Sequence, residues 1–154
     1  MASEYVSFML VFAVGISMVV GITVSMQDLT NSVTQTSSDV ALEKVLNQLK
    51  GTFVNGVNNV NQWNGVSSYQ SNLDISRLLV NKYAYELYVT SSSGMYYLVG
   101  KIVDTTMVNI TKSISLNLNI NDVVINGTIL STHSNPYILF QNDNSGLSVV
   151  LGNA

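Results

Sequence analysis

The sequence predicts an α+β protein in which one long N-terminal helix is followed by an antiparallel β-sandwich. Two observations carry this prediction. Residues 5–26 contain no charged side chain, and after about residue 72 the spacing of apolar residues changes from 3.6 to 2. The chain of 154 residues leaves roughly 120 behind the apolar stretch, the size of one compact β domain.

The apolar stretch is long enough to cross a bilayer. Twenty-two helical residues span ~33 Å. A cleaved secretion signal fits poorly, because no basic residue precedes the run and the run exceeds an ordinary signal core. A helix that is apolar on every side must be buried on every side. The sequence therefore leaves open a membrane anchor and a bundle of identical helices, for which Gly15 and Gly21 would permit close approach.

The helical pattern continues beyond the apolar stretch. Leu42, Val45, Leu46, Leu49 and Phe53 have the three- and four-residue spacing of one helix face. Since no proline occurs before Pro136, nothing forces a break, although a kink would fall in the Thr- and Ser-rich residues 30–40. We expect a helical region over 1–55, a connection rich in Asn, Gly and Ser over 56–71, and the β domain over 72–154.

Short alternating runs separated by turn residues fill the last part of the chain. In residues 113–120, for example, Ile114, Leu116, Leu118 and Ile120 alternate with polar residues. Strands at intervals of 8–12 residues indicate a β-sandwich of the immunoglobulin-like type. Some of the expected strands can be fused; they lie near 72–80, 83–90, 94–103, 105–110, 113–120, 123–130, 136–141 and 146–151.

Composition argues against catalysis and against nucleic-acid binding. Only 10% of residues are charged, and the six Lys and Arg are scattered, so no basic patch faces a phosphate backbone. The chain has no cysteine and a single histidine, His133, in a turn. No nucleophile elbow, phosphate loop or dinucleotide fingerprint is present. We expect no enzyme, no catalytic residues, no cofactor and no metal site.

Two features point instead to the outside of a cell and to protein contacts. Asn109 and Asn126 each begin an N-x-Thr sequence, the acceptor of N-linked glycans. Tyrosines are concentrated in one predicted hairpin, where they serve either cross-strand packing or contact with neighbouring subunits. These tyrosines are Tyr83, Tyr85, Tyr88, Tyr96 and Tyr97.

The layout resembles that of archaeal type IV pilins and archaellins. The similarity covers the whole chain: an apolar N-terminal helix, an amphipathic continuation through LEKVLNQLK (42–50), and a β domain rich in Asn, Ser and Thr. The resemblance implies that the helix anchors the subunit in the membrane before assembly machinery adds it to a filament. It further implies that the helix then packs at the filament core, while the β domain, often N-glycosylated, forms the outer sheath.

The resemblance also suggests roles for particular residues. Glu4 is similar to the glutamate that neutralises an N-terminal amine in many pilins. The family's basic leader does not precede Met1, so either the chain is already processed or it never had a leader. The residues expected to pack in the helix core are Phe8, Leu10, Phe12, Gly15, Val19, Gly21 and Val24.

We therefore expect a homopolymeric surface filament for adhesion or motility. One alternative is a membrane-anchored stator protein of the archaellum, which has a similar layout. Another is an anchored sandwich that binds glycans or surfaces, for which Trp63 would be the first residue to test.

Overall fold

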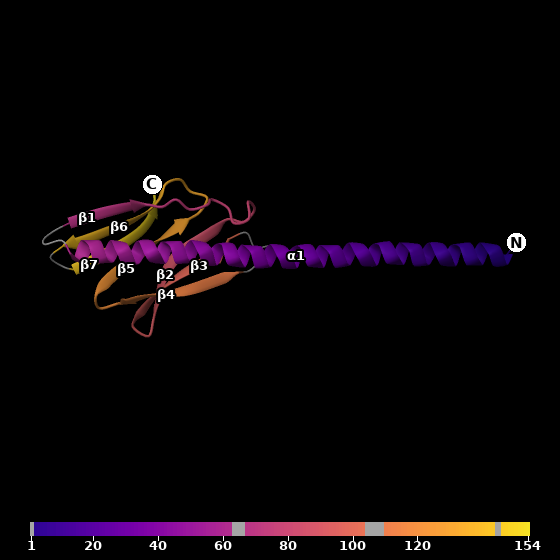
Figure 1. Cartoon of the computed structure of the whole chain (residues 1–154), viewed down its shortest axis with the longest axis horizontal. Coiled ribbons are helices and arrows are strands. Elements are labelled where there is room, and N and C mark those ends of the chain that lie inside the picture. Colours follow the sequence, from indigo (N-terminus) through magenta and orange to yellow (C-terminus); the bar gives the residue numbers. More distant parts are fainter. Residues whose placement is uncertain (1, 63–66, 104–109, 144–145) are drawn as a thin grey trace. The chain divides into compact units, whose positions relative to one another are not determined.

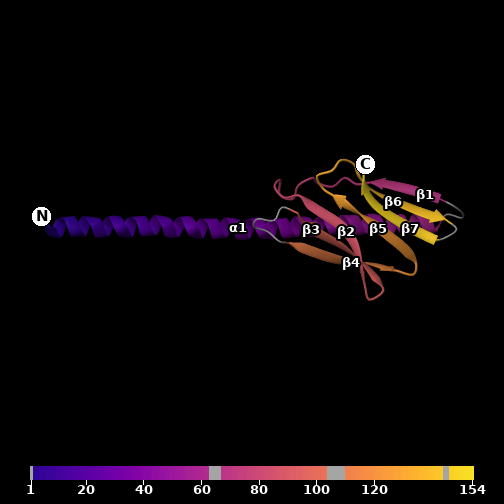
Figure 2. The same ribbon diagram turned by 180° about the vertical axis from the view of Figure 1, so that it is seen from behind.

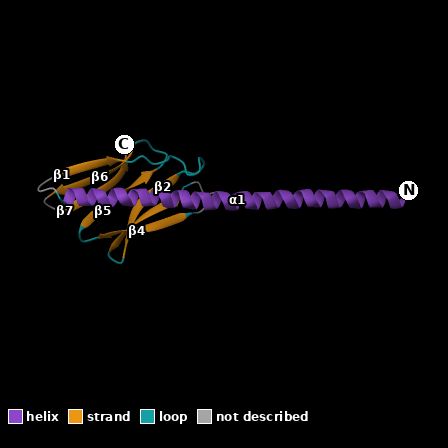
Figure 3. Ribbon diagram, viewed as in Figure 1, coloured by secondary structure: helices purple, strands orange, loops and turns teal. Residues whose placement is uncertain are grey.

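The computed structural model describes residues 2–62, 67–103, 110–143 and 146–154. It consists of one helix, α1 (Ala2–Asn61), followed by seven strands (Figure 3). The chain divides into two units, residues 1–36 and residues 37–154, so that α1 contributes its first part to one unit and its last part to the other. The predicted long apolar helix followed by a β domain is confirmed at this level.

α1 runs through residues 30–40 as one element and continues past the expected end at residue 55. Threonine lowers helix propensity because its β-branched side chain is restricted. Here the hydroxyls of Thr30, Thr34 and Thr36 each donate to the backbone carbonyl four residues earlier. These three hydroxyls are thereby paired within the helix itself, whereas the buried Ser38 hydroxyl in the same part of α1 has no hydrogen-bond partner.

The seven strands form a single sheet in the order β1-β6-β7-β5-β2-β3-β4. All neighbours are antiparallel except β5 and β7, which are parallel. The strands are β1 (Ser67–Asn72), β2 (Tyr85–Ser92), β3 (Met95–Ile102), β4 (Thr111–Asn119), β5 (Val123–Leu130), β6 (Pro136–Asp143) and β7 (Gly146–Asn153).

The immunoglobulin-like sandwich is not confirmed, because all seven strands belong to one sheet. In the second unit, the last part of α1 lies across one face of that sheet in Figure 1, and the strands lie in front of it in the reversed view of Figure 2. The helix supplies the layer that a second sheet would supply in a sandwich. The apolar side chains of this helix and of the sheet face it covers belong to one cluster.

The core lies between this part of α1 and the sheet. The helix side chains Leu42, Leu46, Leu49 and Phe53 are fully buried, as their spacing predicts. From the sheet they meet inward-facing residues of every strand except β1 within one continuous cluster, among them Leu87, Leu98, Leu116, Ile129, Ile138 and Val149. β1 closes the sheet at the other side of β6, where the Tyr69 ring stacks on Phe140 with centroids 6.0 Å apart.

Two further expectations, beside the end of the helix, differ from the structure. β1 begins at Ser67, inside the expected connection, because a polar strand such as SSYQSN shows no apolar alternation and is held by its pairing with β6. The expected strand over 72–80 is a loop that contains only a bridge between Leu79 and Tyr83. Val80 and Asn81 there have φ of 51° and 55°, the left-handed conformation of a turn. Most of the expected strand over 105–110 lies outside the described residues.

An ion pair joins the sheet to the helix at the edge of the core. The Lys112 ammonium on β4 lies 2.7 Å from Asp39 Oδ2 and 3.2 Å from Glu43 Oε2, one helix turn apart. Hydrogen bonds with Asp39 and Glu43 raise the pKa of Lys112 above its usual value. Because the charged side chains of this pair are partly exposed, solvent screens their attraction and the pair contributes little to stability.

At Gly56 and Gly100 the helix and the sheet approach each other too closely for a side chain. A Cβ at Gly56 would fall against the ring of Phe140, and one at Gly100 would lie 2.8 Å from Leu42 Cδ1. By contrast, a Cβ at Gly51, five residues earlier on α1, would meet no other atom within 4 Å. The helix therefore needs a glycine at 56 to lie against β6, and not at 51.

We expect Gly56→Ala to destabilise the fold by about 1–3 kcal/mol, since overpacking against Phe140 outweighs the gain in helix propensity. Gly51→Ala, the matched control, should stabilise it by up to about 1 kcal/mol. Thermal unfolding of the full chain followed by circular dichroism measures both. Equal changes in the two variants would contradict the close approach.

A second prediction concerns Tyr85, which is 0% exposed and donates its phenolic hydrogen bond to the Ser76 carbonyl. Burial raises the pKa of Tyr85 from 10.0 to about 12. The folded chain therefore keeps a proton that the unfolded chain loses between these pH values. The free energy of unfolding should fall by up to about 2 kcal/mol between pH 10 and pH 12.

Denaturant titrations at pH 9, 10, 11 and 12 test the Tyr85 effect, with Tyr85→Phe as the control. The variant loses the Ser76 hydrogen bond at every pH but has no proton to release. Its stability should therefore fall less steeply over this range than that of the parent chain. Parallel slopes would assign the pH dependence to other groups.

Candidate functional site: the apolar surface of residues 4–36

The first unit of the chain consists of the front part of α1, and its apolar side chains have no cover. Every large apolar side chain between residues 5 and 26 is 50–71% exposed. The helix is long and apolar enough to cross a membrane, a property that a signal sequence near an N-terminus shares. This is the largest uncovered apolar surface in the described part of the chain, and surfaces of this kind mark contact with lipid or protein.

Two of the four serine and threonine hydroxyls inside the stretch, those of Ser17 and Thr23, are paired within the helix. The Ser17 hydroxyl donates to the Ala13 carbonyl at 2.9 Å, and the Thr23 hydroxyl donates to the Val19 carbonyl at 2.8 Å. In an apolar medium an unpaired polar group costs several kcal/mol, whereas these hydroxyls are paired without any partner chain. These two hydroxyls therefore do not oppose the transfer of the stretch into an apolar medium.

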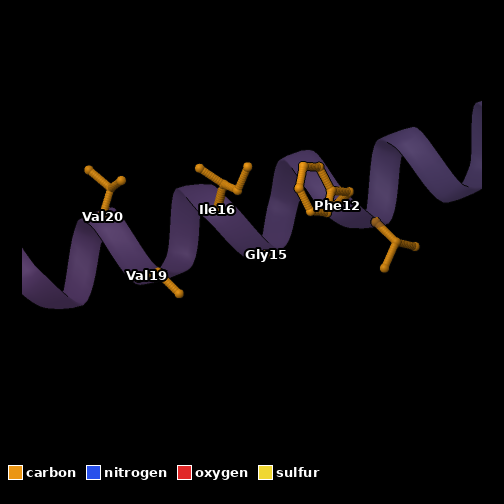
Figure 4. A pocket seen from close by; sticks show the side chains of 6 residues that line it. Phe12, Gly15, Ile16, Val19 and Val20 are labelled. Carbon is orange, nitrogen blue, oxygen red and sulfur yellow. The ribbon is translucent and has the colours of Figure 1, made fainter.

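Two glycines interrupt the apolar surface. Figure 4 shows Ile16 and Val20 projecting from the same side of the ribbon, with a bare turn at Gly15 between Phe12 and Val19. A Cβ at Gly15 or at Gly21 would meet nothing within 4 Å. Within a single chain neither glycine is needed for packing, so any steric reason for a small residue at these positions lies in another molecule.

The predicted helix-core residues all lie on this part of α1 and point to several sides of it, as an all-round apolar helix requires. Phe8, Leu10, Phe12, Val19 and Val24 are each at least half exposed. Glu4 lies in the first turn of α1, where a carboxylate interacts favourably with the helix dipole. Met1, whose amine was its candidate partner, is outside the described residues.

The five tyrosines do not form one surface. Tyr83 and Tyr85 are buried in the core of the second unit. Tyr96 is half-buried against that core, and its phenolic oxygen accepts a hydrogen bond from the Ile125 amide. Only Tyr88 and Tyr97 are half-buried on the sheet face away from α1, where they remain candidates for contact with another subunit.

The two glycan acceptors also differ. Asn126 and Thr128 are exposed on β5 and alternate with the buried Ile125 and Ile129, so both point to the open face of the sheet. Asn109 lies outside the described residues, as does Trp63, the aromatic residue of the glycan-binding alternative.

The single histidine and the acidic side chains are dispersed over the described ranges. No group of three or more His, Asp or Glu side chains lies together there in a way that could hold a metal ion. His133 is an exposed turn residue, as expected, and lines a polar hollow together with Arg77, Asn72 and Asn135.

Comparisons with known proteins add no relative. No family model matches the chain, and neither the curated proteins nor the solved structures contain a significant match. The molecule is thus defined by its own architecture: a long apolar N-terminal helix followed by a seven-stranded, mostly antiparallel β-sheet domain.

Proposed function

We propose that this chain is the structural subunit, or pilin, of an archaeal type IV-like surface filament that serves adhesion or motility. In this proposal residues 4–26 hold the subunit in the membrane before assembly and then pack against copies of themselves at the filament core. The sheet domain faces outward and is N-glycosylated at Asn126 and Asn109. The polymer is a helical assembly of identical chains at the cell surface.

One observation supports the proposal above the others. The apolar side chains of residues 5–26 are exposed on every side of α1. A soluble monomer with such a surface would aggregate, because contiguous apolar patches on soluble proteins rarely exceed a few hundred Å². A membrane covers the surface before assembly, and identical neighbouring helices can cover it in a filament.

The second unit supports the same proposal because its core does not need the front of α1. The sheet domain completes its own core without the front of α1, since residues 37–154 form a separate compact unit. The front helix is therefore free to serve a role outside the fold of its own chain. The neutral outer surface of Asn, Ser and Thr suits a domain exposed on the outside of a polymer.

The proposal predicts that Gly15→Leu or Gly21→Leu abolishes filaments while the sheet domain stays folded. Leucine raises helix propensity by about 1 kcal/mol and meets nothing in its own chain, so any loss must come from contacts with other chains. Electron microscopy of sheared surface material measures the filaments, and circular dichroism checks the fold. Val20→Leu, which adds a single methylene at a residue already 55% exposed, is the control.

The proposal is tested most directly by electron microscopy of filaments sheared from source cells, with mass spectrometry of the chain that they contain. We expect filaments made of this chain, with glycan mass on Asn126 or Asn109. A chain found only in the membrane and never in a filament would contradict the proposal. That outcome would leave the anchored stator protein as the better account.

A further inference from the structure

We propose that a polar hollow at one end of the sheet binds an acidic sugar, a ring that carries one carboxylate and several hydroxyl groups. The hollow has a volume of about 260 Å³ and belongs wholly to the second unit. Its polar wall consists of Asn72, Arg77, Ser131, His133 and Asn135. The proposed filament does not use this surface, so the two proposals stand independently of each other.

The hollow collects the two rarest basic side chains of the protein. Arg77 is the only arginine of the chain and His133 is the only histidine. Arg77 follows β1, whereas His133 lies in the turn between β5 and β6, so only the fold brings them to one place. The chain as a whole has a net charge of −3, yet no acidic side chain lines the hollow. This part of an acidic protein therefore suits an anion.

Hydrogen bonds of the loops hold the hollow in place. The Leu73 amide donates to the Pro136 carbonyl at 2.9 Å and so joins the end of β1 to the start of β6. The Ser76 hydroxyl donates to the Leu78 carbonyl at 2.8 Å, which closes a turn around Arg77. A site whose backbone is fixed before the ligand arrives loses less conformational freedom on binding.

The guanidinium of Arg77 is the group that selects a carboxylate. Within the described part of the chain it forms neither an ion pair nor a hydrogen bond, whereas Lys112 is held by both Asp39 and Glu43. A guanidinium is planar, and its N–H donors match the two oxygens of a carboxylate. A carboxylate from another molecule would therefore pair the arginine that the fold leaves unpaired.

Ser131 adds a buried polar group to the wall of the hollow. It is only 4% exposed, and its Oγ accepts a hydrogen bond from the Tyr85 amide at 2.9 Å. The hydroxyl therefore keeps its own hydrogen for an acceptor in the hollow. Asn72 and Asn135 each carry donors and an acceptor, as do the hydroxyl groups of a sugar.

The remaining lining and the size of the hollow favour a sugar ring over an inorganic anion. Leu73, Ile75 and Pro136 give the hollow an apolar part that can contact the C–H groups of a ring. Pockets for drug-sized ligands occupy roughly 300–1,000 Å³, so this hollow suits a single sugar unit. Arg77 and His133 are exposed, and the unit can therefore belong to a longer polysaccharide.

The single histidine provides a direct measurement, because its imidazole C–H signal is unique in a proton NMR spectrum of the chain. The purified full chain, in a detergent without a sugar headgroup, is titrated with sodium glucuronate. We expect a saturable shift of the His133 signal with a Kd in the millimolar range. Glucose and acetate each carry half of the chemistry and should bind at least about tenfold more weakly.

Three variants separate the role of Arg77 from that of overall charge. Arg77→Gln should weaken glucuronate binding at least about tenfold, since it removes charge-assisted hydrogen bonds. Arg77→Lys keeps the charge without the planar fork and should recover only part of the affinity. Lys82→Gln is the matched control: it removes one positive charge from the same loop, outside the hollow, and should leave binding unchanged.

Several results would overturn the acidic-sugar site. They are the absence of a saturable shift in the millimolar range, and binding of glucose, acetate or sulfate as tight as that of glucuronate. Equal losses in Arg77→Gln and Lys82→Gln would assign the effect to overall charge and equally reject the site. Circular dichroism checks the fold, and if Arg77→Gln melts early, the comparison of Arg77→Lys with the parent chain decides in its place.

Discussion

The structure depends on a single helix whose apolar side chains surround it in its front part and occupy only one side in its last part. Up to residue 26 the helix is apolar on all sides, and from residue 42 onward it is apolar on one side only. The narrow part is covered by the sheet of its own chain, where Leu42, Leu46, Leu49 and Phe53 are fully buried. The wide part cannot be covered in this way, because a sheet reaches only one side of a helix.

This division explains why the chain forms two units. Residues 37–154 contain a complete core, with the helix as one layer and the sheet as the other. Burial of the four helix side chains contributes roughly 1.5–3 kcal/mol each relative to exposure. That contribution depends on close approach, for which Gly56 and Gly100 leave the necessary space. The front of α1 adds nothing to this core, so its apolar surface remains available to lipid or to other chains.

The proposed function follows from one physical requirement, that apolar surface must leave water. For residues 5–26 a membrane or a helical bundle meets the requirement equally well. For Leu29 and Val33 a membrane meets it poorly, since their neighbours along the chain are polar. The Ser and Thr hydroxyls that donate to backbone carbonyls are compatible with both.

The sequence by itself determined the helix, its two patterns and most of the strands. Those features depend on local periodicity: all-round apolar residues over 5–26, a 3/4 spacing over 42–53, and alternation in strands such as β4. It also identified the apolar stretch as the candidate site, because a run of twenty-two uncharged residues is visible in the sequence without any knowledge of tertiary contacts.

Only the tertiary structure decided which layer covers the sheet and which residues lie at its edges. β1 is polar and owes its conformation to pairing with β6, so no local alternation of apolar residues predicts this strand. Tyr83 and Tyr85 alternate like surface tyrosines of a strand, yet they face the helix and are buried, while Tyr88 and Tyr97 face outward. Alternation reveals that a strand has two faces. Which face becomes the core depends on where the helix packs, and that is settled by contacts between residues far apart in the chain.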